Sequence, residues 1–144
     1  MRLWIDADGC PVVRCAVRVA AEYGVAVTLV CDTAHVFAID GVDVITVSTD
    51  ADSADYAIAN RVVPGDVVVT QDYGLSALVL ARGARPVTQN GLIITDDNVG
   101  GLLEARGFAA RVRRGGGRLK GPHRRTHEQD ESFEKALRQL LVKI

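Results

Sequence analysis

Aspartates follow two apolar runs of this sequence in a similar way. Asp6 and Asp8 come directly after the run Leu3–Ile5. Asp72 comes shortly after the run Val67–Val69. Carboxylate oxygens bind hard cations such as Mg²⁺ and Mn²⁺, and they also serve as general acids and bases. Because gathered carboxylates repel one another unless a positive charge lies between them, we expect a divalent-cation site if the fold brings these residues together.

A third candidate ligand, Asp55, lies in a predicted helix. Asp55, Ile58 and Val62 stand at positions i, i+3 and i+7, so the carboxylate shares a stripe with apolar residues that should face the sheet. An acid in the first turn also stabilises a helix through its dipole, and an aspartate can cap a helix outright. A purely structural role therefore stays open for Asp55 and for Asp72.

The elements that must position these aspartates follow from the apolar pattern. Continuous β-rich runs predict strands at 3–5, 26–31, 42–47, 67–70 and 84–88, and helical spacing predicts helices at 12–23, from about 53, at 73–82 and at about 130–142. Alternating strands and helices indicate right-handed crossovers. We therefore predict an α/β fold, a three-layer α/β/α sandwich with a mostly parallel central sheet, formed by one domain over residues 1–144. Ligands of such sheets lie at the carboxyl ends of the strands.

Charge is distributed unevenly along the chain, although the formal net charge is only −1. Residues 1–105 carry 6 basic and 14 acidic side chains, whereas residues 106–125 carry 8 basic and no acidic ones. Such a positive segment favours a polyanionic partner, although a solvated arm that balances the acidic body is the alternative. We expect a helix to about residue 106, a short helical turn at 108–112 and a basic, glycine-rich loop at 113–126. The candidate nucleic-acid-binding residues there are Arg113, Arg114, Arg118, Lys120, Arg124 and Arg125.

Composition argues against several other classes of protein. No apolar run approaches the roughly 18 residues of a membrane span, and no basic-then-apolar signal region opens the chain. The three cysteines form no CxxC pair, and their odd number argues against a disulfide scaffold. We therefore expect a cytoplasmic protein without a membrane partner.

Four motifs occur in combination over essentially the whole chain: Asp6–Val12, Ala54–Ile58, Gly65–Asp72, and Gly121-Pro122 with Arg125, Thr126 and Asp130. Together they resemble the YaiI/YqxD-like family of bacterial proteins, which is related to the PIN-domain nucleases. The resemblance implies a PIN-like fold. By analogy it also implies a Mg²⁺- or Mn²⁺-dependent ribonuclease that attacks phosphodiesters with a metal-activated water, with single-stranded RNA as the expected substrate.

The resemblance also implies roles for individual residues. PIN-type nucleases have an aspartate that ends the first strand, an acid that opens a central helix, and a Thr-x-Asp-x-x-Leu signature. Asp6, Asp55 and the segment Thr70–Leu75 match these features. Asp6, Asp55 and Asp72 are therefore the predicted catalytic residues and metal ligands, with Thr70 in a supporting role.

Two residues are candidates for a fourth ligand position. By its order along the chain, Asn90 could fill it. Asp8, two residues after Asp6, could supply the extra carboxylate instead. We keep both as supporting residues, and Asp8 also as a candidate metal ligand.

Two other functions remain open at this point. The first is a non-catalytic nucleic-acid- or protein-binding module in which the acidic cluster is structural or vestigial. The second is a phosphatase of the haloacid-dehalogenase type, with Asp6 as nucleophile and Asp8 as acid/base. That chemistry needs a lysine beside the phosphoaspartate, and no lysine occurs before Lys120.

Overall fold

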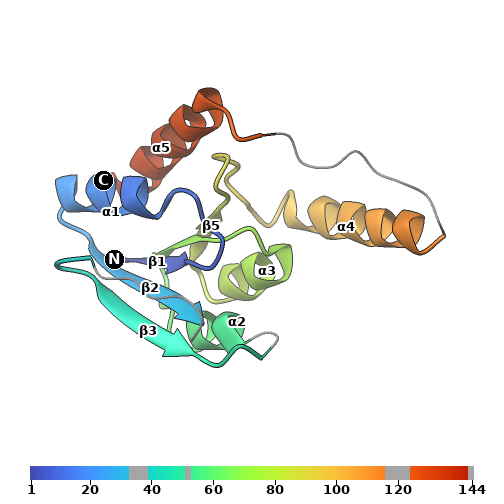
Figure 1. Cartoon of the computed structure of the whole chain (residues 1–144), viewed down its shortest axis with the longest axis horizontal. Helices are drawn as coiled ribbons and strands as arrows, with labels where there is room; N and C mark the ends of the chain where they lie inside the picture. The colour runs from blue at the N-terminus through green and yellow to red at the C-terminus, as the bar shows by residue number, and fades with distance from the viewer. Residues whose placement is uncertain (33–38, 51–52, 116–123, 143–144) are drawn as a thin grey trace.

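The centre of the molecule is a parallel sheet (Figure 1). The computed structural model describes residues 1–32, 39–50, 53–115 and 124–142, with the backbone alone at 108–114. Within this part of the chain one sheet has the strand order β3-β2-β1-β4-β5, and every neighbouring pair is parallel. The strands are β1 (Arg2–Asp6), β2 (Ala26–Asp32), β3 (Asp43–Val47), β4 (Val67–Val69) and β5 (Arg85–Val87). The predicted parallel sheet is confirmed, with β1 in its middle.

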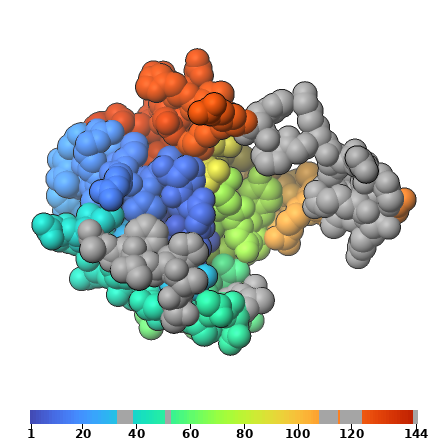
Figure 2. Space-filling view, in the orientation of Figure 1, coloured from blue at the N-terminus to red at the C-terminus, as the bar shows by residue number. Residues whose placement is uncertain are grey.

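Helices cover both faces of the sheet, which confirms the predicted three-layer sandwich. The helices α1 (Val13–Glu22) and α5 (His127–Leu141) lie on one face, and α2 (Ser53–Ala59) and α3 (Tyr73–Ala81) lie on the other. In the space-filling view the red C-terminal helix lies against the blue N-terminal part of the chain (Figure 2). Two ends of the sequence thus form one layer.

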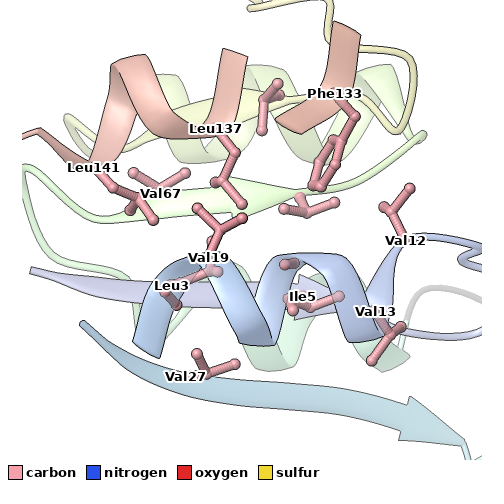
Figure 3. Close-up of a cluster of buried hydrophobic side chains, with 14 of the residues drawn as sticks. Leu3, Ile5, Val12, Val13, Val19, Val27, Val67, Phe133, Leu137 and Leu141 are labelled. Atoms are coloured by element: carbon pink, nitrogen blue, oxygen red, sulfur yellow. The ribbon is translucent and has the colours of Figure 1, made fainter. Parts of the chain in front are cut away.

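The central strand contributes to both hydrophobic cores. Leu3 and Ile5 are fully buried in the core under α1 and α5, where Phe133 and Leu137 meet them from the C-terminal helix (Figure 3). Trp4 points the opposite way, because successive side chains of a strand alternate, and it packs into the core under α2 and α3. Burial of each such side chain contributes about 1.5–3 kcal/mol. The strand that ends in Asp6 is therefore held from both sides.

The helix α4 (Val99–Arg114) corrects one prediction. The sequence predicted an end near residue 106, a separate turn at 108–112 and a loop from residue 113, whereas one helix continues through Arg114. Its glycines each cost about 1 kcal/mol of helix propensity without breaking the helix, and arginine is a good helix former. Figure 1 shows α4 extending away from the sheet after its contact with α3. Among the described helices, none combines the length and apolar content that crossing a membrane requires.

The start of α5 corrects a second prediction. We expected this helix at about 130–142, with Asp130 as its cap, but the helix begins at His127 and Thr126 is its cap. Thr126 Oγ1 accepts the Gln129 amide at 3.3 Å, and Gln129 Oε1 accepts the Thr126 amide at 2.9 Å. This reciprocal capping box satisfies two amides that would otherwise lack partners. The Thr-x-x-Gln signal for it is present in the sequence.

One carboxylate lies deep in the structure, at the amino end of β4. Asp66 is only 2% exposed. Its Oδ1 accepts the Arg2 amide at 2.9 Å, and its Oδ2 accepts Trp4 Nε1 and the Val63 amide, both at 3.0 Å. Three donors therefore compensate its burial, and they join β1, β4 and the segment after α2.

We expect Asp66→Ala to lower the free energy of unfolding by about 3 kcal/mol, because it leaves three donors, among them the buried Trp4 Nε1, without their acceptor. The matched control is Asp43→Ala, which removes an aspartate whose side chain is 76% exposed and pairs with Arg2 at 3.3 Å. An exposed pair contributes less than about 1 kcal/mol. Urea unfolding curves measure both effects, and equal losses in the two variants would contradict this role for Asp66.

Candidate functional site

The candidate site lies where the strand order reverses. From β1 the chain passes through α1 to β2 on one side, and it later returns through α2 to β4 on the other side of β1. In open α/β sheets, ligands bind at the carboxyl ends of the strands at such a switch point. Asp6 is the last residue of β1, and Asp72 lies between β4 and α3. Two of the predicted ligands thus flank the switch point.

A buried hydroxyl group joins the ends of these two strands. Thr70, which is 2% exposed, accepts the Asp72 amide on Oγ1 at 3.0 Å and lies 3.0 Å from Asp6 Oδ2. Because an ionised carboxylate can only accept, the Thr70 hydroxyl donates its proton to Asp6 while its oxygen accepts the Asp72 amide. Thr70 therefore orients the Asp6 carboxylate relative to the turn that carries Asp72.

Asp72 caps the helix α3. Its Oδ1 accepts the amides of Gly74 at 2.7 Å and Leu75 at 3.1 Å, so the structural role that the sequence left open is real. Arg106 Nη1 of α4 lies 3.6 Å from the same oxygen. No described residue donates a hydrogen bond to Oδ2. The cap therefore leaves the second oxygen of this carboxylate available for a ligand.

Asp8 and Asp55 border a hollow of about 150 Å³ next to Asp72. Asp8 also lines a neighbouring cavity with Asp6, and its Oδ2 accepts the Asp32 amide at 2.9 Å. The four predicted carboxylates thus gather at one edge of the sheet. Two further carboxylates, Asp32 and Asp50, line the 150 Å³ hollow, and sequence reasoning did not identify either as a site residue. Asp32 ends the strand β2 as Asp6 ends β1, and this position was the signal that could have identified it.

Excess negative charge marks this edge. Burial raises the pKa of Asp6, and the charges of Asp8 and Asp72 raise it further, whereas the hydrogen bond from Thr70 lowers it. A cation near these oxygens would offset both the burial and the repulsion. Within the described part of the chain, no three Asp, Glu, His or Cys side chains are already arranged around one point as a metal site.

Asn90, one of the two candidates for the fourth ligand position, binds Arg125. Its Oδ1 accepts Arg125 Nη1 at 2.7 Å, and it lines neither cavity of the acidic edge. Arg125 also donates to the Gln89 carbonyl and pairs with Asp130, both at 2.6 Å, and its side chain is 20% exposed. Asn90 and Arg125 therefore tie the loop after β5 to the start of α5.

The structure describes the other predicted nucleic-acid-binding residues only in part. Arg124 is exposed. Arg113 and Arg114 belong to the end of α4, where the structure describes the backbone. Arg118 and Lys120 lie outside the described residues.

A larger hollow of about 550 Å³ lies between α1 and α5, away from the acidic edge. Charged side chains line it, and two ion pairs join the two helices across it. Arg18 pairs with Glu134 at 2.7 Å, and Arg138 pairs with Glu22 at 2.6 Å. We therefore assign this network to helix packing and place the candidate site at the acidic edge.

Comparison with known proteins gives the family. The family model described as "Uncharacterized BCR, YaiI/YqxD family" matches residues 4–143. The chain belongs to the YaiI/YqxD family. This confirms the family predicted from the four motifs.

Relatives in the YaiI/YqxD family match over nearly their whole length. The UPF0178 protein of Exiguobacterium sibiricum is 50% identical over 142 residues, which are 99% of this chain and 97% of the relative. The UPF0178 protein of Ruminiclostridium cellulolyticum is 44% identical over 137 residues (95% and 90%), and that of Clostridium acetobutylicum is 42% identical over 145 residues (99% and 98%). No solved structure matches the chain. The relatives' names state no activity.

For this member of the YaiI/YqxD family, we expect Asp6→Asn to increase the stability at neutral pH. Since the pKa of Asp6 in the folded state lies above its ordinary value of 3.8, the folded protein binds this proton more tightly than the unfolded chain does. Asp6 therefore lowers the free energy of unfolding progressively as the pH rises from about 3.8 through the raised pKa. The variant should be more stable than the wild type at pH 7 in metal-free buffer, and the two should converge towards pH 3.5.

Urea unfolding at several pH values measures this difference, and Asp97→Asn, at an exposed site, controls for the loss of one charge. A difference between Asp6→Asn and wild type that stays constant with pH would contradict the pKa assignment.

Proposed function

We propose that this member of the YaiI/YqxD family is a Mg²⁺- or Mn²⁺-dependent nuclease that cleaves phosphodiester bonds in single-stranded RNA. The observation that carries the proposal is the hydrogen-bonded path from Asp72 through Thr70 to Asp6 at the switch point of the sheet. Asp8 and Asp55 border the adjoining hollow. The acids implied by the resemblance to PIN-type nucleases thus lie at one edge.

The donor set fits a hard divalent cation. Asp6, Asp55 and Asp72 would hold the cation, with Asp8 beside them, and all their ligand atoms are oxygens. Burial and the neighbouring charges of Asp8 and Asp72 raise the pKa of Asp6, and a cation bound there would offset both. When bound, a divalent cation would lower the pKa of a water molecule and neutralise charge on a phosphodiester.

Neighbouring groups of the chain orient the carboxylates of Asp6 and Asp72. Thr70 fixes Asp6 through its hydroxyl group, and the amide of Asp72 fixes that hydroxyl in turn. The amides of α3 hold one oxygen of Asp72 in place. Both carboxylates are therefore positioned before a ligand arrives, which reduces the cost of ordering them on binding.

Arg106 is the residue of the basic segment 106–125 that we assign as a phosphate ligand. Its side chain is 56% exposed and lies 3.6 Å from Asp72 Oδ1. A guanidinium group can donate to phosphate oxygens with its remaining N–H groups. A strand that presents a phosphodiester to the acidic edge would then meet a positive group beside it.

Each of Asp6→Asn, Asp55→Asn and Asp72→Asn should lower Mn²⁺-dependent cleavage of labelled single-stranded RNA by at least about 100-fold, because each removes a proposed ligand charge. Asparagine is as good a helix cap as aspartate, so Asp72→Asn should keep α3 intact. Asp43→Asn, at the opposite end of its strand from this edge, is the matched control and should keep full activity.

Cleavage by the three variants at the wild-type rate would refute the nuclease assignment. A calorimetric titration with Mn²⁺ distinguishes the nuclease from the alternative, a binding module that does not need a metal ion. That module predicts no heat of binding and no rise in melting temperature, together with salt-sensitive RNA binding.

We expect Arg106→Ala to raise KM for single-stranded RNA without lowering kcat. Each phosphate contact on a single strand contributes about 0.7 to the slope of log affinity against log salt, so the slope should fall by about that amount. Binding is measured by fluorescence anisotropy in an Asp6→Asn background, which prevents turnover. Arg82→Ala, at an exposed position after α3, should leave the slope unchanged. An unchanged slope in Arg106→Ala would exclude the phosphate contact.

A further inference from the structure

We propose that the cavity beside Asp6 is a nucleobase-binding subsite in which the side-chain amide of Gln71 donates a hydrogen bond to the base. The inference deepens the proposed function and rests on it, because the base would belong to the nucleotide next to the cleaved phosphodiester. The cavity also contains the proposed ligand Asp6, but the nuclease proposal does not itself require that a base binds there.

The cavity has the size of a single nucleotide component. Its volume is about 250 Å³, and it is lined by Asp6, Asp8, Gly9, Cys10, Val69, Thr70, Gln71 and Gln89. Pockets that take drug-sized molecules measure about 300–1,000 Å³, so this one is suited to a base with part of its sugar. It shares Asp8 with the 150 Å³ hollow that Asp55 and Asp72 border. A group bound here therefore lies next to the proposed cleavage site.

The orientation of the Gln71 amide is fixed. Its Oε1 accepts the backbone amide of Gln89 at 2.8 Å, because only the oxygen of a glutamine side chain can accept from an N–H group. The Gln89 carbonyl is held in turn by Arg125 Nη2 at 2.6 Å. The wall of the cavity is therefore braced on both sides. No described residue accepts from Gln71 Nε2, which leaves two N–H donors at the cavity.

The charges of the cavity exclude a phosphate and favour a neutral group. Asp6 and Asp8 repel an anion, whereas they accept hydrogen bonds from amino or imino groups. Val69 and Cys10 supply apolar surface for the face of a planar ring. Every nucleobase carries both donors and acceptors on its edge. A base can therefore accept a hydrogen bond from Gln71 and donate hydrogen bonds to Asp6 or Asp8 at the same time.

The test uses uncharged nucleosides, so that neither a metal ion nor phosphate attraction is needed. Adenosine, guanosine, cytidine and uridine are titrated separately into ¹⁵N-labelled protein in metal-free buffer, and the side-chain amide signals of Gln71 are followed by NMR. We expect at least one nucleoside to saturate these signals with a Kd on the order of 1–10 mM, a range accessible to this measurement. Free ribose, which lacks the base, should bind at least about tenfold more weakly.

The deciding variant is Gln71→Glu. Its carboxylate can still accept the Gln89 amide, so the wall keeps its bond, but the Nε2 donors are lost. Nucleoside binding, followed through the Gln89 backbone amide, should weaken about fivefold. Gln139→Ala, which removes an exposed glutamine of α5, is the matched control and should bind like wild type.

Three results would overturn the subsite: ribose binding as tightly as the nucleosides, Gln71→Glu binding like wild type, or no response of the Gln71 signals to any nucleoside. The result is independent of the cleavage assay. Nucleoside binding in a protein whose Asp72→Asn variant still cleaves RNA would refute the metal-ligand assignment and leave the subsite in place.

Discussion

The hydrogen bond between Thr70 and Asp6 depends on the register of two strands. Ile5 lies opposite Val69 in the pairing of β1 with β4, so the next residues of each strand, Asp6 and Thr70, come together at the sheet edge. A shift of one residue would turn the threonine towards the opposite face. The register is held by the two hydrophobic cores, since β1 places alternate side chains in each of them. The geometry of the acidic edge therefore follows from packing many residues away.

Aspartates at the two ends of the central strands have opposite effects on the stability of the fold. At the amino end, Asp66 accepts three hydrogen bonds, which offset the cost of its burial and join separate segments of the fold. At the carboxyl end, Asp6 accepts a hydrogen bond from Thr70, but burial and the charges of Asp8 and Asp72 raise its pKa, so its ionisation opposes folding. Carboxylates that are costly to the folded state in this way are typical of sites that bind a ligand. This contrast supports a functional role for Asp6 and the carboxylates beside it.

Much of the architecture could be predicted because it follows from local patterns. Continuous apolar runs and helical spacing gave the strands, the order of layers and the placement of Asp6 and Asp72 at one edge, since parallel strands must present their ends together. Contacts between distant residues were not predictable in this way. The pairing of Arg125 with Asn90 depends on how α5 meets the loop after β5, and nothing in either local sequence indicates it. The extent of α4 was missed because glycine weakens a helix without ending it.

The position of α5 has a consequence for how the chain is made. Its residues Phe133, Leu137 and Leu141 complete the core that Leu3 and Ile5 of the first strand begin. During synthesis at about 5–20 residues per second, the ribosome releases the last helix on the order of ten seconds after the first strand. Until then α1 alone covers this face of the nascent sheet. This core is therefore completed only after the last helix has been synthesised, and the chain before that point is the form most exposed to aggregation or to capture by chaperones.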